Sequence, residues 1–324
     1  MSSHEGKGAI FASFAANVGI AISKFIAFFI TGSTSMLAEA VHSLVDSSNQ
    51  ILLLIGGRNA KKKPTPAHPF GYGRAHFLYA FIVSIVLFSL GGVFAIVEGI
   101  EKIKHPEMLS SPLVAYIVLG IAMLFESLAL RTALREAKSF KPINQNWWRF
   151  LQQTKSVNHI ILAFEDTAAL IGLSFATIGI TTALLTGNPM WDGVATLAIG
   201  ALLVMVAAIL FHEVKSLLIG EAADVTTERH MREIITGVEG VDHVVDLKTL
   251  YVGPMELFIA MKITVGHDDT ASIVAQTIDE VEARLRAAFP IAKLIYVEPD
   301  LFKTPKQQSR SDQQIQKRIS RPKK

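Results

Sequence analysis

The sequence has no cysteine among its 324 residues. This absence excludes disulfide bonds, zinc sites built from thiolates, and redox sensing by thiols. Charged residues are scarce as well, at 18% of the chain, whereas hydrophobic residues make up 50%. The hydrolase motifs G-x-S-x-G and H-E-x-x-H are also missing. An intramembrane hydrolase therefore has no support, and we expect that the protein is not an enzyme.

Long apolar runs dominate the first two thirds of the chain, and the mean hydropathy is +0.39. A run of about 20 apolar residues is long enough to cross a bilayer as a helix. Six such runs occur, at residues 8–30, 36–57, 76–100, 112–134, 158–185 and 192–218. The first run lacks the cleavage pattern of a signal peptide. The sequence thus predicts an α-helical membrane protein with six transmembrane helices in a transport domain at residues 1–222.

Basic residues are concentrated in two of the loops between these runs. They are Arg58, Lys61, Lys62, Lys63 and Arg74 in one loop, and Arg131, Arg135, Lys138, Lys141, Arg149 and Lys155 in the other. Such loops stay in the cytoplasm, so we expect both termini to be cytoplasmic. Because the N-terminus is short and carries no organellar extension, we expect the cytoplasmic (inner) membrane of a bacterium.

After residue 222 the composition becomes that of a small soluble domain. Helical patterns cover residues 226–240 and 271–289, and strand patterns cover 241–253, 255–265 and 292–299. Asp268 or Thr270 is the expected N-cap of the second helix. The order αββαβ predicts a ferredoxin-like α+β domain at 223–301, with its helices on one face of the sheet. The basic, Gln-rich tail at 302–324 is expected to be disordered.

The second apolar run carries two ionisable side chains. His42 and Asp46 are four residues apart in the sequence, so in a helix they point from one face toward the same place. Ionisable groups inside a membrane are costly unless they face a partner, a cation or water. The pair could simply hydrogen-bond to another helix, but it also has the spacing of two metal ligands.

The fifth apolar run carries the adjacent carboxylates Glu165 and Asp166. Two carboxylates side by side in lipid repel each other unless one is protonated or a cation lies between them. If the second and fifth helices face each other, a divalent cation would be held by His42, Asp46, Asp166 and, as a fourth ligand, Glu165. One nitrogen with several oxygens suits Zn²⁺ in tetrahedral geometry, or Mn²⁺ or Fe²⁺ with added water.

Other polar residues in the apolar runs have two readings each. Asn49 could orient Asp46 through its amide, or it could bond to a neighbouring helix. Lys24 and Glu126 could belong to the transport pathway, but we favour buried charge partners. Asp192 is expected to be the N-cap of the last helix rather than a metal ligand.

Three segments together resemble the cation diffusion facilitator family. They are SMLAEAVHSLVDSSNQ, PAHPFGYGRAHFLYAF and the ending IYVEPD. The runs FEDTAALIGL and WRFLQQTKS most resemble the branch that includes a mitochondrial zinc transporter of animals and its bacterial relatives. This resemblance implies a homodimer that exports a divalent metal, usually Zn²⁺, from the cytosol in exchange for protons. His42 would then be both a metal ligand and a proton carrier. A Mn²⁺ or Fe²⁺ exporter and a membrane metal sensor without transport remain the alternatives.

The sequence departs from the family pattern at three places. Leu162 stands where a fifth-helix histidine is common, and Glu165 is our substitute ligand. In the loop before the third helix, His68 is accompanied by Thr65 and Tyr72 where other members complete a second metal site. The ligand positions of the cytoplasmic zinc cluster align with Val245, Lys262, Ala275 and Glu298. We therefore expect both additional sites to be absent, and dimerisation to depend on packing.

Overall fold

The computed structural model describes residues 3–140 and 157–301, with side chains described at 17–132, 134–135 and 165–301. The chain divides into two compact units, Met1–Ile219 and Gly220–Lys324. The tail that we expect to be disordered lies outside the described residues, as do the loop residues Lys141, Arg149 and Lys155.

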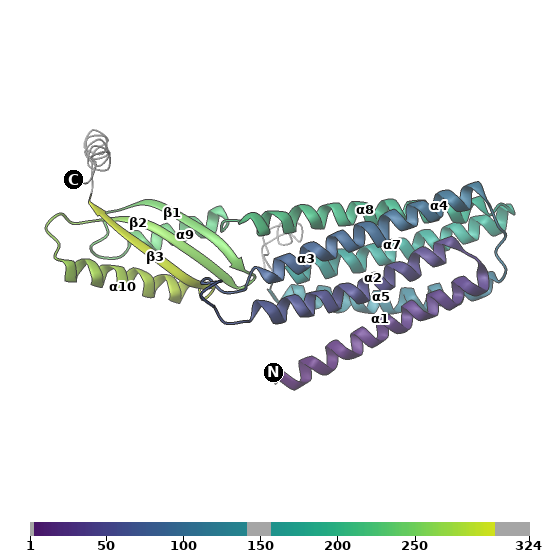
Figure 1. Ribbon diagram of the computed structural model, residues 1–324, viewed down its shortest axis with the longest axis horizontal. Helices are drawn as coiled ribbons and strands as arrows, with labels where there is room; N and C mark the ends of the chain where they lie inside the picture. The colour runs from purple at the N-terminus through teal and green to yellow at the C-terminus, as the bar shows by residue number, and fades with distance from the viewer. Residues whose placement is uncertain (1–2, 141–156, 302–324) are drawn as a thin grey trace, which may run out of the picture. The chain divides into compact units, whose positions relative to one another are not determined.

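The first unit consists of long helices that pack side by side (Figure 1). Its helices are α1 (Ser3–Thr31), α2 (Thr34–Ala60), α5 (Pro112–Phe140), α7 (Val157–Thr186) and α8 (Met190–Ile219). Between α2 and α5, helix α3 (Ala75–Val86), the π-helix η1 (Leu87–Val93) and α4 (Phe94–Lys104) follow one another without a break.

Four of these helical segments are long and apolar enough to cross a membrane: Ala75–Lys104, Pro112–Thr132, Glu165–Thr186 and Met190–Ile219. In α1, the described side chains form a shorter apolar helix, Asn17–Thr31. Helix α2 is not among the four, because its apolar residues alternate with Glu39, His42 and other polar side chains. The structure therefore establishes a helical membrane unit with four clear spans.

Two helical hairpins turn at glycines with positive φ. Gly32 (φ 69°) ends α1, and Gly187 (φ 63°) ends α7. Glycine adopts this conformation without steric cost, which permits an abrupt reversal of the chain. Each following helix gains a polar cap. Ser33 accepts a hydrogen bond from the Met36 N–H at 3.2 Å, and the Asn188 side chain accepts one from the Met190 N–H at 3.0 Å.

Glycines let α8 approach the α3–η1–α4 segment closely. A Cβ atom placed on Gly200 would lie 2.8 Å from the backbone nitrogen of Ile96, and one on Gly99 would lie 2.9 Å from that of Leu197. Backbones that approach this closely gain dispersion contacts, which drive helix association in lipid. Helix α8 and the α3–η1–α4 segment thus form a tightly packed pair, and α1, α2, α5 and α7 pack against one another beside it (Figure 1).

Asp192 does not have the position that the sequence suggested. Helix α8 begins at Met190, so Asp192 lies within its first turn and not at its N-cap. The fully buried carboxylate accepts hydrogen bonds from the Ser33 hydroxyl and from the Thr34 N–H, both at 2.8 Å. The N-cap prediction was therefore wrong. The Asp192 carboxylate caps the N-terminus of α2, a neighbouring helix, and not the N-terminus of its own helix.

The second unit has the predicted element order αββαβ. Its elements are α9 (Val225–Thr236), β1 (His243–Gly253), β2 (Glu256–Val265), α10 (Ala271–Ala288) and β3 (Ala292–Leu301). The strands form a sheet of order β1-β2-β3, with β1 and β2 antiparallel and β2 and β3 parallel. Thr270, and not Asp268, caps α10, since its side chain accepts the Ile273 N–H.

Alternation of side chains along β2 separates the two faces of this sheet. Leu257, Ile259, Met261 and Ile263 are buried, and α9 and α10 pack against the neighbouring strands. Tyr296 on β3 is 57% exposed and lies beside Phe258, with the ring centroids 5.7 Å apart. The sheet thus has one face in the core and one face that includes exposed aromatic surface.

Candidate metal-binding site

Helix α2 brings His42 and Asp46 together. The Nδ1 atom of His42 lies 3.6 Å from Oδ1 of Asp46, and the two side chains are 1% and 15% exposed. Within the described residues, both nitrogens of His42 and Oδ1 of Asp46 lack a hydrogen-bond partner. Buried polar atoms in proteins nearly always have such a partner. An imidazole nitrogen and a carboxylate oxygen can both bind a cation, so the pair is a candidate metal site.

Helix α7 carries the two acidic residues that the sequence singled out. Glu165 is 5% exposed, and its Oε1 accepts a hydrogen bond from the Asn49 amide of α2 at 2.8 Å. Asp166 is half-buried. This bond supports the interpretation that Asn49 bonds to a neighbouring helix, because its amide donates to Glu165 of α7 and not to Asp46. Its amide oxygen is buried and finds no partner in the described part of the chain.

The four predicted ligands are near one another but do not form a closed cluster. The carboxyl group of Asp46 interacts electrostatically with those of Glu165 and Asp166, and α2 packs against α7. Among the side chains that the structure describes (17–132, 134–135 and 165–301), however, no group of three or more from His, Asp and Glu lies close enough together to hold a metal ion. The structure pairs His42 with Asp46, and Asn49 with Glu165, without joining the two pairs.

A buried ion pair next to this site was not predicted in full. The ammonium group of Lys24 on α1 lies 2.9 Å from Oε2 of Glu39 on α2, and both side chains are fully buried. Lys24 also donates a hydrogen bond to the hydroxyl of Ser43 at 2.7 Å. Lys24 was recognised as a charge in need of a partner, but Glu39 was overlooked. The signal was present, since Glu39 is the first acidic residue of the following helix.

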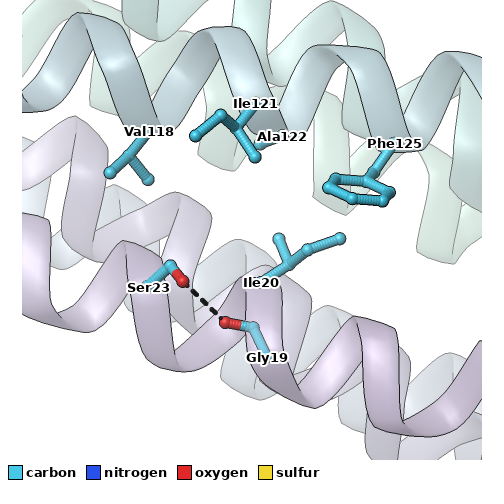
Figure 2. Close-up of a pocket in the computed structure, with 7 residues that line it drawn as sticks. All are labelled: Gly19, Ile20, Ser23, Val118, Ile121, Ala122 and Phe125. Carbon is cyan, nitrogen blue, oxygen red and sulfur yellow. Dashed lines mark hydrogen bonds between the residues drawn. The ribbon is translucent and has the colours of Figure 1, made fainter.

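A pocket between α1 and α5 has a different character (Figure 2). Its volume is about 330 Å³, and it is lined by Gly19, Ile20, Ser23, Val118, Ile121, Ala122 and Phe125. The Ser23 hydroxyl already donates a hydrogen bond to the carbonyl of Gly19 at 2.8 Å. Because the remaining lining side chains are apolar, this pocket offers no ligands to a metal ion.

The loop before α3 brings together the positions at which some family members complete a second metal site. The hydroxyls of Thr65 and Tyr72 lie 3.2 Å apart, and the rings of His68 and Tyr72 have centroids 4.5 Å apart. The side chains of Thr65, His68 and Tyr72 are therefore neighbours in space. Two of them carry hydroxyl groups that bond to each other, and neither supplies a carboxylate or an imidazole.

In the second unit, two of the aligned cluster positions form an ion pair. The ammonium group of Lys262 lies 3.0 Å from Glu298 and 3.0 Å from Asp300. The hydrogen bonds that it donates to these two carboxylates hold the pKa of Lys262 above its ordinary value. A lysine ammonium thus lies between the carboxylates of Glu298 and Asp300, and Lys262 and Glu298 are two of the four positions that the sequence analysis compared with the zinc cluster.

Comparison with known families accounts for both units. Residues 10–219 match the cation efflux transmembrane domain, and residues 223–300 match the cytoplasmic domain of cation efflux proteins. The resemblance drawn from the sequence motifs is thereby confirmed.

Individual relatives agree with these matches. The proton-coupled zinc antiporter SLC30A9, mitochondrial, is 29% identical over 231 residues in Homo sapiens and 31% identical over 233 residues in Xenopus laevis. Each alignment covers 71% of this chain but 41% of the antiporter, so the chain spans about two fifths of their length. The cation-efflux pump FieF of Klebsiella pneumoniae is 28% identical, with 84% of this chain and 85% of the pump covered. This multi-pass membrane protein belongs to the cation efflux family, the cation diffusion facilitators, whose members are transporters and not enzymes.

Proposed function

We propose that this protein exports a divalent cation, Zn²⁺ in the first place, from the cytosol in exchange for protons. His42, Asp46, Glu165 and Asp166 bind the cation, and the helices alternate between states open to either side of the membrane. The observation that carries the proposal is the buried pair of His42 and Asp46, whose facing atoms lack hydrogen-bond partners in the described part of the chain. Leaving one buried polar atom unsatisfied costs about 1–3 kcal/mol. A bound cation would offset that cost.

Binding requires a movement between α2 and α7. Asn49 orients Glu165, but the acidic pair on α7 does not form one cluster with His42 among the described side chains. A cation at His42 and Asp46 would attract both carboxylates and draw α7 toward α2. The described arrangement therefore corresponds to a state in which the ligands are separated, and closure of the site accompanies cation binding.

Proton exchange follows from the types of ligand. Imidazole and carboxylate bind a cation only in their deprotonated forms, so cation binding releases protons and protonation releases the cation. His42 is suited to both roles, since an imidazole nitrogen can bind either a proton or a cation. The similarity to SLC30A9, which is named a proton-coupled zinc antiporter, supports this assignment.

A second candidate is export of Mn²⁺ or Fe²⁺. The proposed ligand set has one nitrogen donor and three carboxylates. Mn²⁺ prefers carboxylate oxygens to nitrogen or sulfur ligands. The match to a cation-efflux pump, FieF, is compatible with such a substrate.

The wider architecture is part of the same proposal. Helices α1 and α2 complete a set of six spans, both termini lie on the cytoplasmic side as the basic loops require, and the transport domain ends near residue 222. Two copies associate through the cytoplasmic unit, which is supported by the family match at residues 223–300. The exposed aromatic surface of the sheet, with Tyr296 and Phe258, is available for such packing.

Uptake into proteoliposomes tests the proposed substrate. Zn²⁺, Mn²⁺ and Fe²⁺ are each offered to wild-type protein, to Asp46→Ala and to Ser47→Ala, a neighbouring buried hydroxyl as matched control. We expect Zn²⁺ flux in wild type and in Ser47→Ala, and none in Asp46→Ala. Flux of Mn²⁺ or Fe²⁺ in preference to Zn²⁺ would favour the second candidate, and undiminished flux in Asp46→Ala would refute the site.

A further inference from the structure

A fully buried positive charge lies in the helical unit beside the proposed cation site. Lys24 on α1 bonds Glu39 of α2 at 2.9 Å and the Ser43 hydroxyl at 2.7 Å. A buried charge is expensive unless it is compensated. Among the described side chains, Lys24 bonds directly to one carboxylate, that of Glu39, which compensates its positive charge.

Glu39 is held where α1, α2 and α7 meet. Its Oε2 accepts the bond from Lys24, whereas Oε1 is buried and has no hydrogen-bond partner among the described residues. Oε1 packs directly over Gly172 of α7, where a Cβ atom would collide with it. Gly172 thus leaves room for the Glu39 carboxylate. Among the described residues, Oε1 accepts no hydrogen bond that would help to compensate the negative charge.

The pair is coupled to the proposed cation site by position and by charge. Glu39 precedes His42 by three residues, so the two lie on neighbouring turns of one helix face. Ser43, which Lys24 contacts, directly follows His42. The positive charge of Lys24 acts electrostatically on both His42 and Asp46. Glu126 of α5 interacts with Lys24 and Glu39 as well. The net charge of Lys24 and Glu39 therefore acts on any cation bound at His42 and Asp46.

We infer that Lys24 and Glu39 are a positioning pair that sets how tightly the neighbouring site holds its cation. Lys24 is a tethered cation that repels the transported one, and Glu39 neutralises that repulsion. This inference rests on the proposed function. It predicts that removal of either partner changes transport in opposite directions, because one change leaves an unbalanced positive charge and the other an unbalanced negative charge.

A purely structural role predicts a different result. If the pair only joined α1 to α2, either single substitution would remove the same bond and impair the protein in the same direction. Charge balance and structural support are therefore separated by the sign of the change in KM, and not by loss of activity alone.

The experiment measures Zn²⁺ uptake by full-length protein in proteoliposomes, for wild type, Glu39→Gln, Lys24→Met and the double variant. Glu39→Gln is expected to raise KM by roughly tenfold or more, the order of magnitude that one unbalanced charge produces near a divalent ion in a protein interior. Lys24→Met is expected to lower KM and also to lower kcat, since the cation leaves more slowly. The double variant, neutral again, should return KM to within about threefold of wild type.

Two further variants keep the test decisive if a substitution prevents folding. Lys24→Arg retains the charge and should leave KM near the wild-type value. Gly172→Ala retains every charge but displaces the Glu39 carboxylate from Lys24, so KM should rise as in Glu39→Gln. Shifts of KM in the same direction for Glu39→Gln and Lys24→Met, or a double variant no closer to wild type than the singles, would overturn the inference. Absence of flux in wild type would instead refute the proposed function. In that case equilibrium Zn²⁺ binding to the same variants would still test the inference, with the dissociation constant in place of KM.

Discussion

The amide of Asn49 on α2 donates a hydrogen bond to Oε1 of Glu165 on α7, with 2.8 Å between the two atoms. This bond joins the two helices that carry the proposed ligands. It also holds Glu165 in a defined orientation, although Glu165 is separated from Asn49 by 116 positions in the chain.

Replacement of Asn49 by Leu should weaken cation binding. Without the amide, Glu165 loses its partner and its orientation, and loss of such supporting groups costs roughly 10–100-fold in metal affinity. Equilibrium Zn²⁺ binding to the purified protein measures the effect. Ser48→Ala is the matched control, since the Ser48 hydroxyl bonds only to the Leu44 carbonyl of its own helix in the described structure. Equal affinity in Asn49→Leu and wild type would show that the bond from Asn49 does not support cation binding.

The glycine contact between α8 and the α3–η1–α4 segment should tolerate no side chain. In Gly200→Val the new Cβ would lie 2.8 Å from the Ile96 nitrogen and 3.0 Å from the Gly92 carbonyl oxygen. Backbone atoms do not move aside easily, so we expect a loss of about 1–3 kcal/mol in unfolding free energy. Denaturation in detergent, followed by circular dichroism, measures it. Gly120→Ala is the control, because nothing lies within 4 Å of its added Cβ, and it should be neutral or slightly stabilising.

Asp192→Ala should separate the N-terminal end of α2 from α8. The substitution removes the acceptor for Ser33 and for the Thr34 N–H and leaves those buried donors unsatisfied, at a cost of about 1–3 kcal/mol. The midpoint of thermal unfolding in detergent should fall accordingly. Glu101→Ala, at a side chain that is 64% exposed, should leave the midpoint unchanged. Equal midpoints for the two variants would mean that the buried bonds of Asp192 add no net stability.

The N-cap of α9 should stabilise that helix in a pH-dependent way. Burial alone would raise the pKa of Asp224, but hydrogen bonds from Thr226 and Thr227 outweigh it and hold the pKa below its ordinary value. A carboxyl group with a lowered folded-state pKa stabilises above its unfolded pKa, about 3.9, and the stabilisation is lost as pH falls through the folded-state value. At neutral pH, Asp224→Ala should cost α9 about 1 kcal/mol.

Hydrogen exchange of the α9 amides in the full-length protein measures this cost. Protection should fall in Asp224→Ala at neutral pH, while Asp279→Ala, on an exposed position of α10, should leave α9 unchanged. Protection in wild type that does not decrease toward acidic pH would contradict the assigned role of the Asp224 carboxylate.

The sequence predicted what depends on local periodicity. The long apolar runs located the helices of the first unit to within a few residues, and the spacing of His42 and Asp46 placed them on one face of α2. The order of elements in the second unit follows from alternation and turn residues, because these act between near neighbours in the chain. Thr270 and Asp268 were equally good caps by composition, and only the backbone path selects Thr270.

Relationships between helices could not be derived in this way. The bond from Lys24 to Glu39, the bond from Asn49 to Glu165, and the capping of α2 by Asp192 all depend on which helix faces join. A single sequence does not specify those faces, since several polar residues compete for each partner. The same limit explains why the four proposed ligands could be named while their separation in this structure could not be foreseen.

Zn²⁺ flux under an imposed pH gradient tests the central claim most directly. Proteoliposomes containing wild type, Asp46→Ala or Asp166→Ala are loaded at acidic pH, placed at neutral pH, and compared with the same vesicles after the gradient has been collapsed. The account predicts uptake in wild type that follows the gradient, and no uptake in either variant although both remain folded. Tight Zn²⁺ binding by wild type without flux, or gradient-driven flux retained in both variants, would contradict it.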